Sequence, residues 1–403
     1  MANAPRLFTR PFVLLVAGHF LQALGWSSML VLPVYLGGLG ASHTEIGSVM
    51  AAASVGGLCF RPAVGWAIDR VGRKPTLIFG TLILAVGMGL ISLVDAVGPL
   101  IYLSRVLIGI GAGALFTAYF VFVSDFIPPS RRTEGIALFG ISGLLPVALN
   151  GVSDDLAQLF GEGTSGLKFL FPILAIIVLL SIVFVIFVPE QRRAPSTVAR
   201  TGSFRGVMRT IGHVQLRPVW VATMIFSTLV AVFMAFVTIT AQQRNIESAS
   251  DLWVAYAGGA VGVRILGAKL PDLVGTSNLV VPAIAAYIAG CLGVAHCSNY
   301  GELMLAGAAS GLGHGYCFPV LTSQVMTRTP LVYRGSAMAF FTAIWEACAL
   351  IMTPLMGMLA DKKGLELMFA SLAIGTMICL IIWVWLEHRT IAKTRDLALH
   401  DAN

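Results

Sequence analysis

Charged residues are scarce in this chain. They make up only 11% of its 403 residues, whereas 57% are hydrophobic, and soluble domains carry roughly 25% charged residues. Apolar runs that reach the roughly 20 residues needed to cross a bilayer recur from end to end. The shortage of charge therefore excludes a large soluble domain and predicts a polytopic membrane protein that is embedded in a lipid bilayer.

Paired cysteines and the motifs of several enzyme classes are also missing. The six cysteines form no C-x-x-C pair and nearly all lie in apolar runs, so we expect no disulfide and no metal site. The sequence has no H-E-x-x-H, no G-x-S-x-G and no paired intramembrane carboxylates, which argues against a membrane-embedded enzyme. It also lacks the ATP-binding motif G-x-x-x-x-G-K-[ST], so we expect no cofactor and an ion gradient as the energy source.

Long apolar stretches are what the sequence has in abundance. The first, from Pro11 to beyond Leu32, is too long for a signal-peptide core and shows no clear cleavage site, so we interpret it as a membrane helix. The whole pattern predicts an all-α membrane protein with twelve transmembrane helices, at roughly 11–37, 44–69, 76–95, 98–126, 132–157, 167–188, 217–243, 251–271, 277–296, 299–327, 333–360 and 365–387.

The longest polar interruption of the apolar pattern runs from Pro189 to Arg217. It holds six arginines together with proline, serine and threonine, a composition typical of a solvated linker. We therefore expect an N-terminal six-helix bundle over residues 1–190, a cytoplasmic linker over 191–216 and a C-terminal six-helix bundle over 217–403.

Basic residues are distributed unevenly over the loops. With the N-terminus inside, nineteen lysines and arginines fall on the cytoplasmic side and four on the opposite side, not counting three arginines inside helices. The four are Lys168, Arg244, Lys362 and Lys363. This bias predicts a multi-pass protein of the cell (inner) membrane with both termini in the cytoplasm. It also accounts for the net charge of +7, so we expect no nucleic-acid partner.

Matching motifs recur in the two halves of the chain. RPAVGWAIDRVG at the end of the second expected helix matches RILGAKLPDLVG at the end of the eighth, at an offset of 203. Three glycines of the fourth helix match three of the tenth at an offset of 202, and GVSDD matches GMLAD at an offset of 206. The matched residues include Arg61 with Arg264, Asp69 with Asp272, Gly72 with Gly275, Gly109 with Gly311, and Asp155 with Asp361. Three nearly equal offsets predict two related, pseudo-symmetric bundles.

Two of these motifs also carry a family resemblance. GWAIDRVGRKP, residues 65–75, resembles the loop between helices two and three of the major facilitator superfamily of secondary transporters, G-x-x-x-D-R-x-G-R-[KR]. LSRVLIGIGAGA, residues 103–114, resembles that family's fourth-helix motif. With twelve helices and a central linker, the chain is most similar to small bacterial efflux permeases of the superfamily. The helix-five motif of drug–proton antiporters, G-x-x-x-G-P-x-x-G-G, is replaced here by GISGLLPVALNGVSDD, so that motif does not support antiport.

The charged loop after the second helix is the first candidate functional element. Gly72 allows a tight turn after Asp69, and the basic residues hold the loop at the cytoplasmic face. The resemblance implies a charge relay among Asp69, Arg73 and Asp125 that holds the two bundles together on the cytoplasmic side and releases them when they rock apart. The expected cytoplasmic latch comprises Gly65, Asp69, Arg70, Gly72, Arg73, Lys74 and Asp125. The alternative, that these residues only fix topology, explains the basic residues but neither the acid nor the two glycines.

Polar residues within the expected helices are few and are the second candidate site. A charge at the bilayer centre costs about 2.5–3.5 kcal/mol on insertion scales, so each such residue must face protein or water. Glu346 is the only acid expected near a helix midpoint, which makes it a candidate for proton coupling; a static ion pair with a buried arginine is the alternative. His314 and His19 are further proton-coupling candidates, with a neutral, hydrogen-bonded core histidine as the alternative for each.

The resemblance also implies which helices line a central cavity, namely the first, fourth, seventh and tenth. The substrate-cavity candidates are Arg105, Gln22, Tyr119, His314 and Tyr316. For Tyr119, helix packing is an equal alternative. Arg61 and Arg264 are expected to be structural, with backbone carbonyls or aspartates as partners.

Three functional classes follow from these observations. A secondary transporter agrees with the family resemblance and with the repeat. A channel agrees poorly with two bundles that rock against each other, and the sequence lacks the motifs of a membrane-embedded enzyme. We expect proton-coupled efflux of a small organic solute by a monomer, with the solute and protons as its partners. Proton-coupled uptake of an organic anion is the alternative, because arginine and histidine outnumber acids within the helices.

Overall fold

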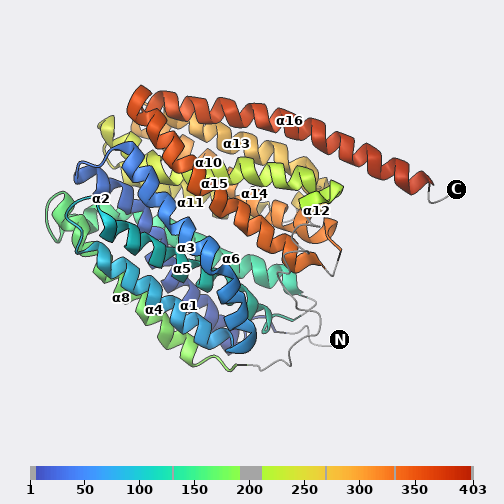
Figure 1. Ribbon diagram of the computed structural model, residues 1–403, viewed down its shortest axis with the longest axis horizontal. Helices are drawn as coiled ribbons and strands as arrows, with labels where there is room; N and C mark the ends of the chain where they lie inside the picture. Colours follow the sequence, from blue (N-terminus) through green and yellow to red (C-terminus); the bar gives the residue numbers. More distant parts are fainter. Residues whose placement is uncertain (1–5, 129–130, 191–210, 268–269, 331–332, 401–403) are drawn as a thin grey trace.

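The computed structural model describes residues 6–128, 131–190, 211–267, 270–330 and 333–400 (Figure 1). Some side chains within these ranges, among them those of Asp69 and Asp272, lie outside the description. The described residues form helices joined by short turns and contain no strand. The all-α expectation is therefore confirmed.

The first half of the chain forms one group of helices. It consists of α1 (Arg10–Ser27), η1 (Ser28–Val31), α2 (Leu32–Gly38), α3 (His43–Arg70), α4 (Arg73–Ile91), α5 (Pro99–Ser124), α6 (Arg132–Ala148), η3 (Leu149–Val152), α7 (Ser153–Gln158) and α8 (Thr164–Ile186). The first expected helix is thus divided among α1, η1 and α2, and the fifth among α6, η3 and α7.

The second half forms a second group. It consists of η4 (Val214–Leu216), α10 (Arg217–Gln243), η5 (Ala249–Asp251), α11 (Leu252–Leu266), α12 (Leu270–Val274), α13 (Thr276–His296), α14 (Tyr300–Arg328), α15 (Arg334–Lys363) and α16 (Leu365–His400). The expectation of a continuous eighth helix over 251–271 is wrong, because α11 ends at Leu266. The twelfth helix runs beyond its expected end at residue 387.

Nine helical segments in the described part of the chain are long and apolar enough to cross a membrane. The expected fifth, eighth and tenth spans are not among them. α6 has 17 residues and α11 has 15. α14 is a continuous helix of 29 residues, but its many glycines and polar residues make it less apolar. The count of twelve spans therefore stays a prediction.

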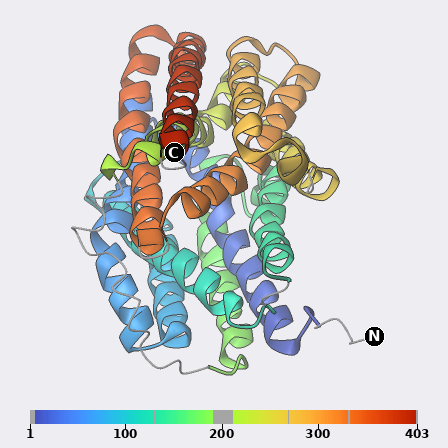
Figure 2. The same ribbon diagram turned by 90° about the vertical axis from the view of Figure 1, so that its right-hand side faces the viewer.

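The two groups lie side by side, the blue-to-green helices against the yellow-to-red ones (Figures 1 and 2). Contacts between them run mainly along two helix pairs, α3 with α15 and α6 with α11. α2 also meets α10. α3 and α15 run antiparallel and stay in contact over much of their length. This pair therefore positions the polar residues that each half presents to the other, among them Arg61 and Glu346.

The repeat is visible in the backbone. Gly72 is the N-cap of α4 with a φ of +120°, and Gly275 is the N-cap of α13 with a φ of +89°. Both angles lie in the region that only glycine adopts without strain. The same tight turn thus follows α3 in the first half and α12 in the second. We call the end of the molecule that carries these two turns the inner end and the opposite end the outer end.

Candidate functional site

At the inner end, the structure brings together two residues of the expected latch. The Arg73 guanidinium at the start of α4 lies 3.3 Å from the Asp125 carboxylate, which follows α5 and has a side chain only 1% exposed. A buried carboxylate is stable as an anion only with such a partner. Arg70 is exposed, and Gly65 has no atom within 4 Å of the position a Cβ would take. The latch role of these residues stays a prediction.

Glu190 is a member of this cluster that the sequence analysis missed. Its Oε1 accepts hydrogen bonds from the backbone N–H groups of Arg73, at 2.7 Å, and Lys74, at 3.3 Å. A Cβ on Gly72 would lie 2.3 Å from the same oxygen and would displace this carboxylate, whereas the φ of +120° by itself favours glycine. An anion at a helix N-terminus is favourable because the free N–H groups and the helix dipole both attract it. Glu190 thereby ties the segment that follows α8 to the start of α4.

The second half has a corresponding ion pair at the inner end, in which the acidic and basic residues have changed places. Arg328, at the end of α14, pairs with both carboxylate oxygens of Glu387 on α16, at 3.0 and 2.5 Å. Ser277, in the first turn of α13, joins both residues through its hydroxyl. Arg328 lies 203 positions after Asp125, so a base stands where the first half has an acid. No pattern in the sequence singled out this pair, because its members are 59 residues apart.

Near the middle of the α3–α15 contact, Glu346 reaches across to the first half. Its Oε1 lies 3.4 Å from the guanidinium of Arg61 on α3, and a Cβ on Gly57 would meet the same oxygen at 2.8 Å. The ion pair therefore joins the two groups of helices, with side chains 24% and 28% exposed. This contact is the one that the static ion-pair alternative expects for Glu346. A movement of one half relative to the other would also break it, as the proton-coupling alternative requires.

Arg105 is bound to backbone rather than open to a cavity. It is 6% exposed, and its guanidinium donates to the carbonyl oxygens of Val49, at 3.3 Å, and Met50, at 3.0 Å, on α3. Arg264, the repeat counterpart of Arg61, donates to the carbonyl of Gly315 at 3.3 Å.

The polar candidates of α1 and α5 lie in the core of the first half. His19 is 8% exposed and its Nδ1 is 2.8 Å from the Ser142 hydroxyl on α6. Its ring contacts those of Tyr119 and Phe139, at 5.1 and 4.2 Å between centroids. Gln22 is 7% exposed. These contacts match the core-histidine alternative and bring His19 and Tyr119 together.

His314 occupies a hydrogen-bonded chain in the second half. Its Nδ1 is 2.5 Å from the hydroxyl of Tyr256 on α11, which is 3.3 Å from that of Tyr287 on α13. The rings of Phe226 and Trp345 flank the imidazole, at 5.4 and 6.4 Å. Sequence reasoning missed the tyrosine pair, because neither residue has a distinctive neighbour in the chain.

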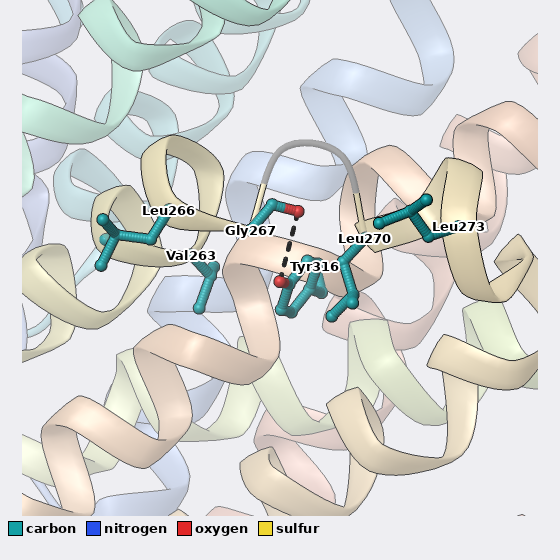
Figure 3. Close-up of a pocket in the computed structure, with 7 residues that line it drawn as sticks. Val263, Leu266, Gly267, Leu270, Leu273 and Tyr316 are labelled. Carbon is teal, nitrogen blue, oxygen red and sulfur yellow. Dashed lines mark hydrogen bonds between the residues drawn. The ribbon is translucent and has the colours of Figure 1, made fainter.

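Tyr316 lies apart from His314, in a cavity at the inner end of α11. The cavity has a volume of about 390 Å³ and is lined by Gly262, Val263, Leu266, Gly267, Leu270, Leu273 and Tyr316 (Figure 3). The Tyr316 hydroxyl donates to the carbonyl of Gly267 at 3.4 Å, where the helix breaks. The helix ends here because Pro271, four residues on, has no N–H for the Gly267 carbonyl, which instead accepts from the Leu270 N–H at 3.0 Å. The predicted end at residue 271 was therefore too late.

The outer end carries a contact between the halves that the sequence analysis also missed. Asp361, near the end of α15, accepts from the backbone N–H groups of His43 and Thr44 at 2.8 and 2.9 Å. Its carboxylate is also 2.5 Å from the Thr44 hydroxyl and 2.8 Å from His43 Nδ1. The Asp361 carboxylate thus accepts the free backbone N–H groups at the N-terminus of α3. The GMLAD motif contained Asp361 but gave no sign of its partners.

The sequence pattern of the Major Facilitator Superfamily matches residues 15–301 and 297–400, nearly the whole described chain. The chain belongs to the Major Facilitator Superfamily. It is therefore a multi-pass membrane protein with the family and fold of a transporter for small molecules, as the two motifs of the sequence implied.

Several relatives in the superfamily are efflux proteins. The chain is 24% identical to the multi-drug resistance efflux pump PmrA of Streptococcus pneumoniae, over 94% of this chain and 96% of that one. It is 23% identical to the staphylopine export protein of Staphylococcus aureus, over 85% and 87%. Matches to Multidrug resistance protein 3 of Bacillus subtilis, 33% identical, and YajR of Escherichia coli, 28% identical, cover 23% and 41% of this chain but only 19% and 35% of those proteins.

Solved structures of superfamily transporters share the fold. A bacterial homologue of the human lysosomal transporter Spinster, in an inward-facing conformation, superposes with a TM-score of 0.75 at 13% identity, over 97% of this chain and 99% of that one. The nucleoside transporter NupG gives a TM-score of 0.73 at 13% identity, over 94% and 99%. At these identities the likeness establishes the fold alone.

Proposed function

We propose that this superfamily member is a secondary active transporter that moves a small organic solute by alternating access, with proton-coupled efflux as its mode. Residues 1–190 and 217–403 form its two moving bundles, joined by the cytoplasmic segment 191–216. The proposal includes a monomer in the cell inner membrane with both termini in the cytoplasm, the orientation that the basic loops favour.

The Arg61–Glu346 ion pair is the observation that carries the coupling proposal. It links α3 to α15 between the two halves, so a rocking movement must stretch or break it. A carboxylate that loses its arginine partner in a weakly hydrated place takes up a proton to avoid an isolated charge. Proton uptake by Glu346 then accompanies one conformation and proton release the other, which lets a proton gradient bias the cycle.

Efflux is supported by the printed functions of the relatives. PmrA is described as a multi-drug resistance efflux pump and the Staphylococcus aureus relative as an export protein. Both similarities extend over most of this chain. Export of a small organic solute is therefore the first choice of direction.

Uptake of an organic anion remains the second candidate, for one specific reason. The helices around this interface hold two arginines, Arg61 and Arg105, for the single mid-helix acid Glu346, which is an excess of positive charge. Such an excess favours a carboxylate or another anion as the solute.

A vesicle experiment tests both candidates. The purified protein is reconstituted, a pH gradient is imposed in either direction, and uptake of a panel of organic cations, neutral solutes and anions is measured. We expect accumulation of at least one solute that is driven by the gradient and abolished by a protonophore. Efflux predicts movement of solute against the proton flow and uptake predicts movement with it. Gradient-independent leakage of solutes at channel-like rates would contradict the proposal.

A further inference from the structure

Three helices meet around His43 at the outer end. His43 is the first residue of α3, in the first half of the molecule. Its Nδ1 lies 2.8 Å from a carboxylate oxygen of Asp361 on α15, and its Nε2 lies 3.2 Å from the side-chain amide nitrogen of Gln243 on α10. Both partners belong to the second half. One imidazole therefore joins the two halves through both of its ring nitrogens.

These two contacts agree with a neutral imidazole that is ready to accept a proton. In the neutral form, Nδ1–H donates to the Asp361 carboxylate and Nε2 accepts from the Gln243 amide N–H. A proton on Nε2 turns that nitrogen into a donor, and rotation of the Gln243 amide presents its oxygen as the acceptor. Both protonation states of His43 thus find partners in the same arrangement, and solvent reaches the pair because the side chains of His43 and Asp361 are 20% and 29% exposed.

The surroundings of His43 contain one close charge. The ionisable side chains on the elements around it are those of Glu45, Arg244, Asp361, Lys362 and Lys363. Among the described residues, Asp361 alone lies within ion-pair distance of the imidazole. The Glu45 carboxylate turns back to the Ser42 N–H, and the Arg244 guanidinium is bound to carbonyls at the end of α13. The two lysines are exposed, α2 has no charged residue, and α5 has none before Arg105.

The approach of α3 and α15 at this point is close. A Cβ on Gly357 would lie 2.3 Å from the carbonyl oxygen of His43, so the two backbones touch. The backbone N–H groups of His43 and Thr44 both donate to the Asp361 carboxylate, and hydrogen bonds to a carboxylate favour its ionised form. The negative charge opposite the imidazole is therefore held in place by the closed outer end itself.

Protonation of His43 stabilises this closed arrangement. A charged imidazole forms an ion pair with Asp361 across the two halves. If the outer end opens, the charged imidazole loses that partner and remains at the N-terminus of α3, where the helix dipole disfavours a positive charge. The closed state thus binds the proton more tightly than the open state, so closure is favoured as the pH falls through the range in which histidine changes its charge, about pH 8 to 5.

A second histidine at the outer end lacks this arrangement. His296, the last residue of α13, lies 3.5 Å from Glu366 on α16, and both side chains are 66% exposed. Both residues belong to the second half. Protonation of His296 therefore leaves the contact between the halves as it is, which makes His296 the matched control for His43.

We propose that His43 and Asp361 form a pH-sensitive switch that closes the outer end of the molecule when His43 takes up a proton from the outer solution. The switch differs from the coupling assigned to Glu346, because His43 exchanges protons with the outer solvent and sets the fraction of closed molecules instead of carrying a proton across. The inference rests on the proposed alternating-access function, in which a closed outer end is one of the two states.

Electron-electron double resonance between spin labels at Ala41 and Glu247 tests this switch. The protein, with its natural cysteines replaced, is measured in detergent without a gradient and in a Glu346→Gln background, so that Glu346 does not titrate. We expect the ratio of closed to open molecules to rise about fivefold between pH 8 and pH 5.5. His43→Gln should show the pH 8 ratio at both pH values, whereas His296→Gln should leave the rise unchanged.

Asp361→Asn provides a second variant, which keeps the histidine but removes the charge opposite it, and the rise should again be lost. A parent protein without the rise, a change in the opposite direction, or a rise that survives His43→Gln would overturn the switch. Loss of closure at both pH values in His43→Gln would also overturn it, because His43 would then be a structural donor. Vesicle transport is scored separately: a normal rise without gradient-driven transport would refute the proposed function and leave the switch standing, and transport without the rise would do the reverse.

Discussion

The carboxylate of Asp361 accepts a hydrogen bond from the backbone N–H of Thr44, 2.9 Å away, and so joins the last turn of α15 to the first turn of α3. The two residues are 317 positions apart and belong to opposite halves of the chain. The bond is one of four from Asp361 to His43 and Thr44. At the same interface Thr353 donates to the carbonyl of Gly47 at 3.0 Å. The halves are therefore held together at the outer end.

Asp361→Asn should open the outer end. The asparagine loses the charge that the α3 N-terminus attracts and at least two of the four acceptor positions. We expect the population with separated outer ends to rise several-fold. Spin labels at Ala41 and Glu247, in a protein whose natural cysteines are replaced, report that separation by electron-electron double resonance.

The matched control for this change is Asp155→Asn. Asp155 is the repeat counterpart of Asp361 and is exposed. Its substitution should leave the distance distribution as it is. If Asp361→Asn also leaves it as it is, Asp361 does not hold the outer end closed.

Sequence reasoning succeeded where a feature is local. The tight turns at Gly72 and Gly275 follow from glycine's backbone freedom within a short motif, and the repeat offset predicted that they would correspond. The Arg73–Asp125 contact was implied by a family motif rather than by spacing. In each case a few neighbouring residues, or a known pattern, contain the information.

The same reasoning failed where a contact depends on the register of distant helices. Glu190, Asp361 and the Arg328–Glu387 pair each find their partner through packing of segments that are far apart in the chain. Such contacts become visible only when the helices have been placed.

Glu346→Gln should separate the two interpretations of the central ion pair. If Glu346 carries the coupling proton, the glutamine variant loses transport driven by a pH gradient but keeps energy-independent solute exchange, because the bundles still rock. If the pair is static, Arg61 is left without its charge partner and both activities fall together. Both activities are measured in one vesicle preparation.

A second substitution, at Arg61, tests whether the loss of activity comes from the unpaired arginine. Combining Glu346→Gln with Arg61→Gln removes both charges. A static pair predicts recovery of both activities in the double variant, whereas a coupling role predicts that gradient-driven transport stays lost. Gradient-driven transport that survives Glu346→Gln alone would exclude Glu346 from coupling and direct attention to His19 or His314.

The inner cluster of the first half should affect transport more than stability. We expect Asp69→Asn and Arg73→Ala to lower transport about tenfold while expression stays near normal, because the first changes the proposed latch and the second removes the partner of Asp125. Arg10→Ala, at an exposed arginine outside the latch, is the control. Wild-type transport rates in both latch variants would leave topology as the only role of this loop.

The Arg328–Glu387 pair should instead govern stability. Glu387 is 5% exposed, and removal of one member of a buried ion pair costs about 3–5 kcal/mol, because the other charge is left without compensation. Glu387→Gln should therefore lower the thermal unfolding midpoint by several degrees in detergent. Glu366→Gln, whose His296 contact is 66% exposed on both sides, should leave the midpoint within error; equal shifts in the two variants would contradict this assignment.

Arg105 and His314 should respond in opposite ways, although both were expected to line the cavity. Arg105 holds the carbonyls of Val49 and Met50, so Arg105→Ala leaves a close α3–α5 contact without its donors, and the unfolding midpoint should fall. Among the residues that the structure describes, His314 bonds to Tyr256, and its ring lies beside Trp345. His314→Ala should therefore keep the unfolding midpoint of the free protein but lose most of the increase that a transported solute gives. A normal solute-dependent increase in His314→Ala would exclude His314 from the substrate-cavity candidates. An unchanged midpoint in Arg105→Ala would show that its carbonyl contacts are dispensable.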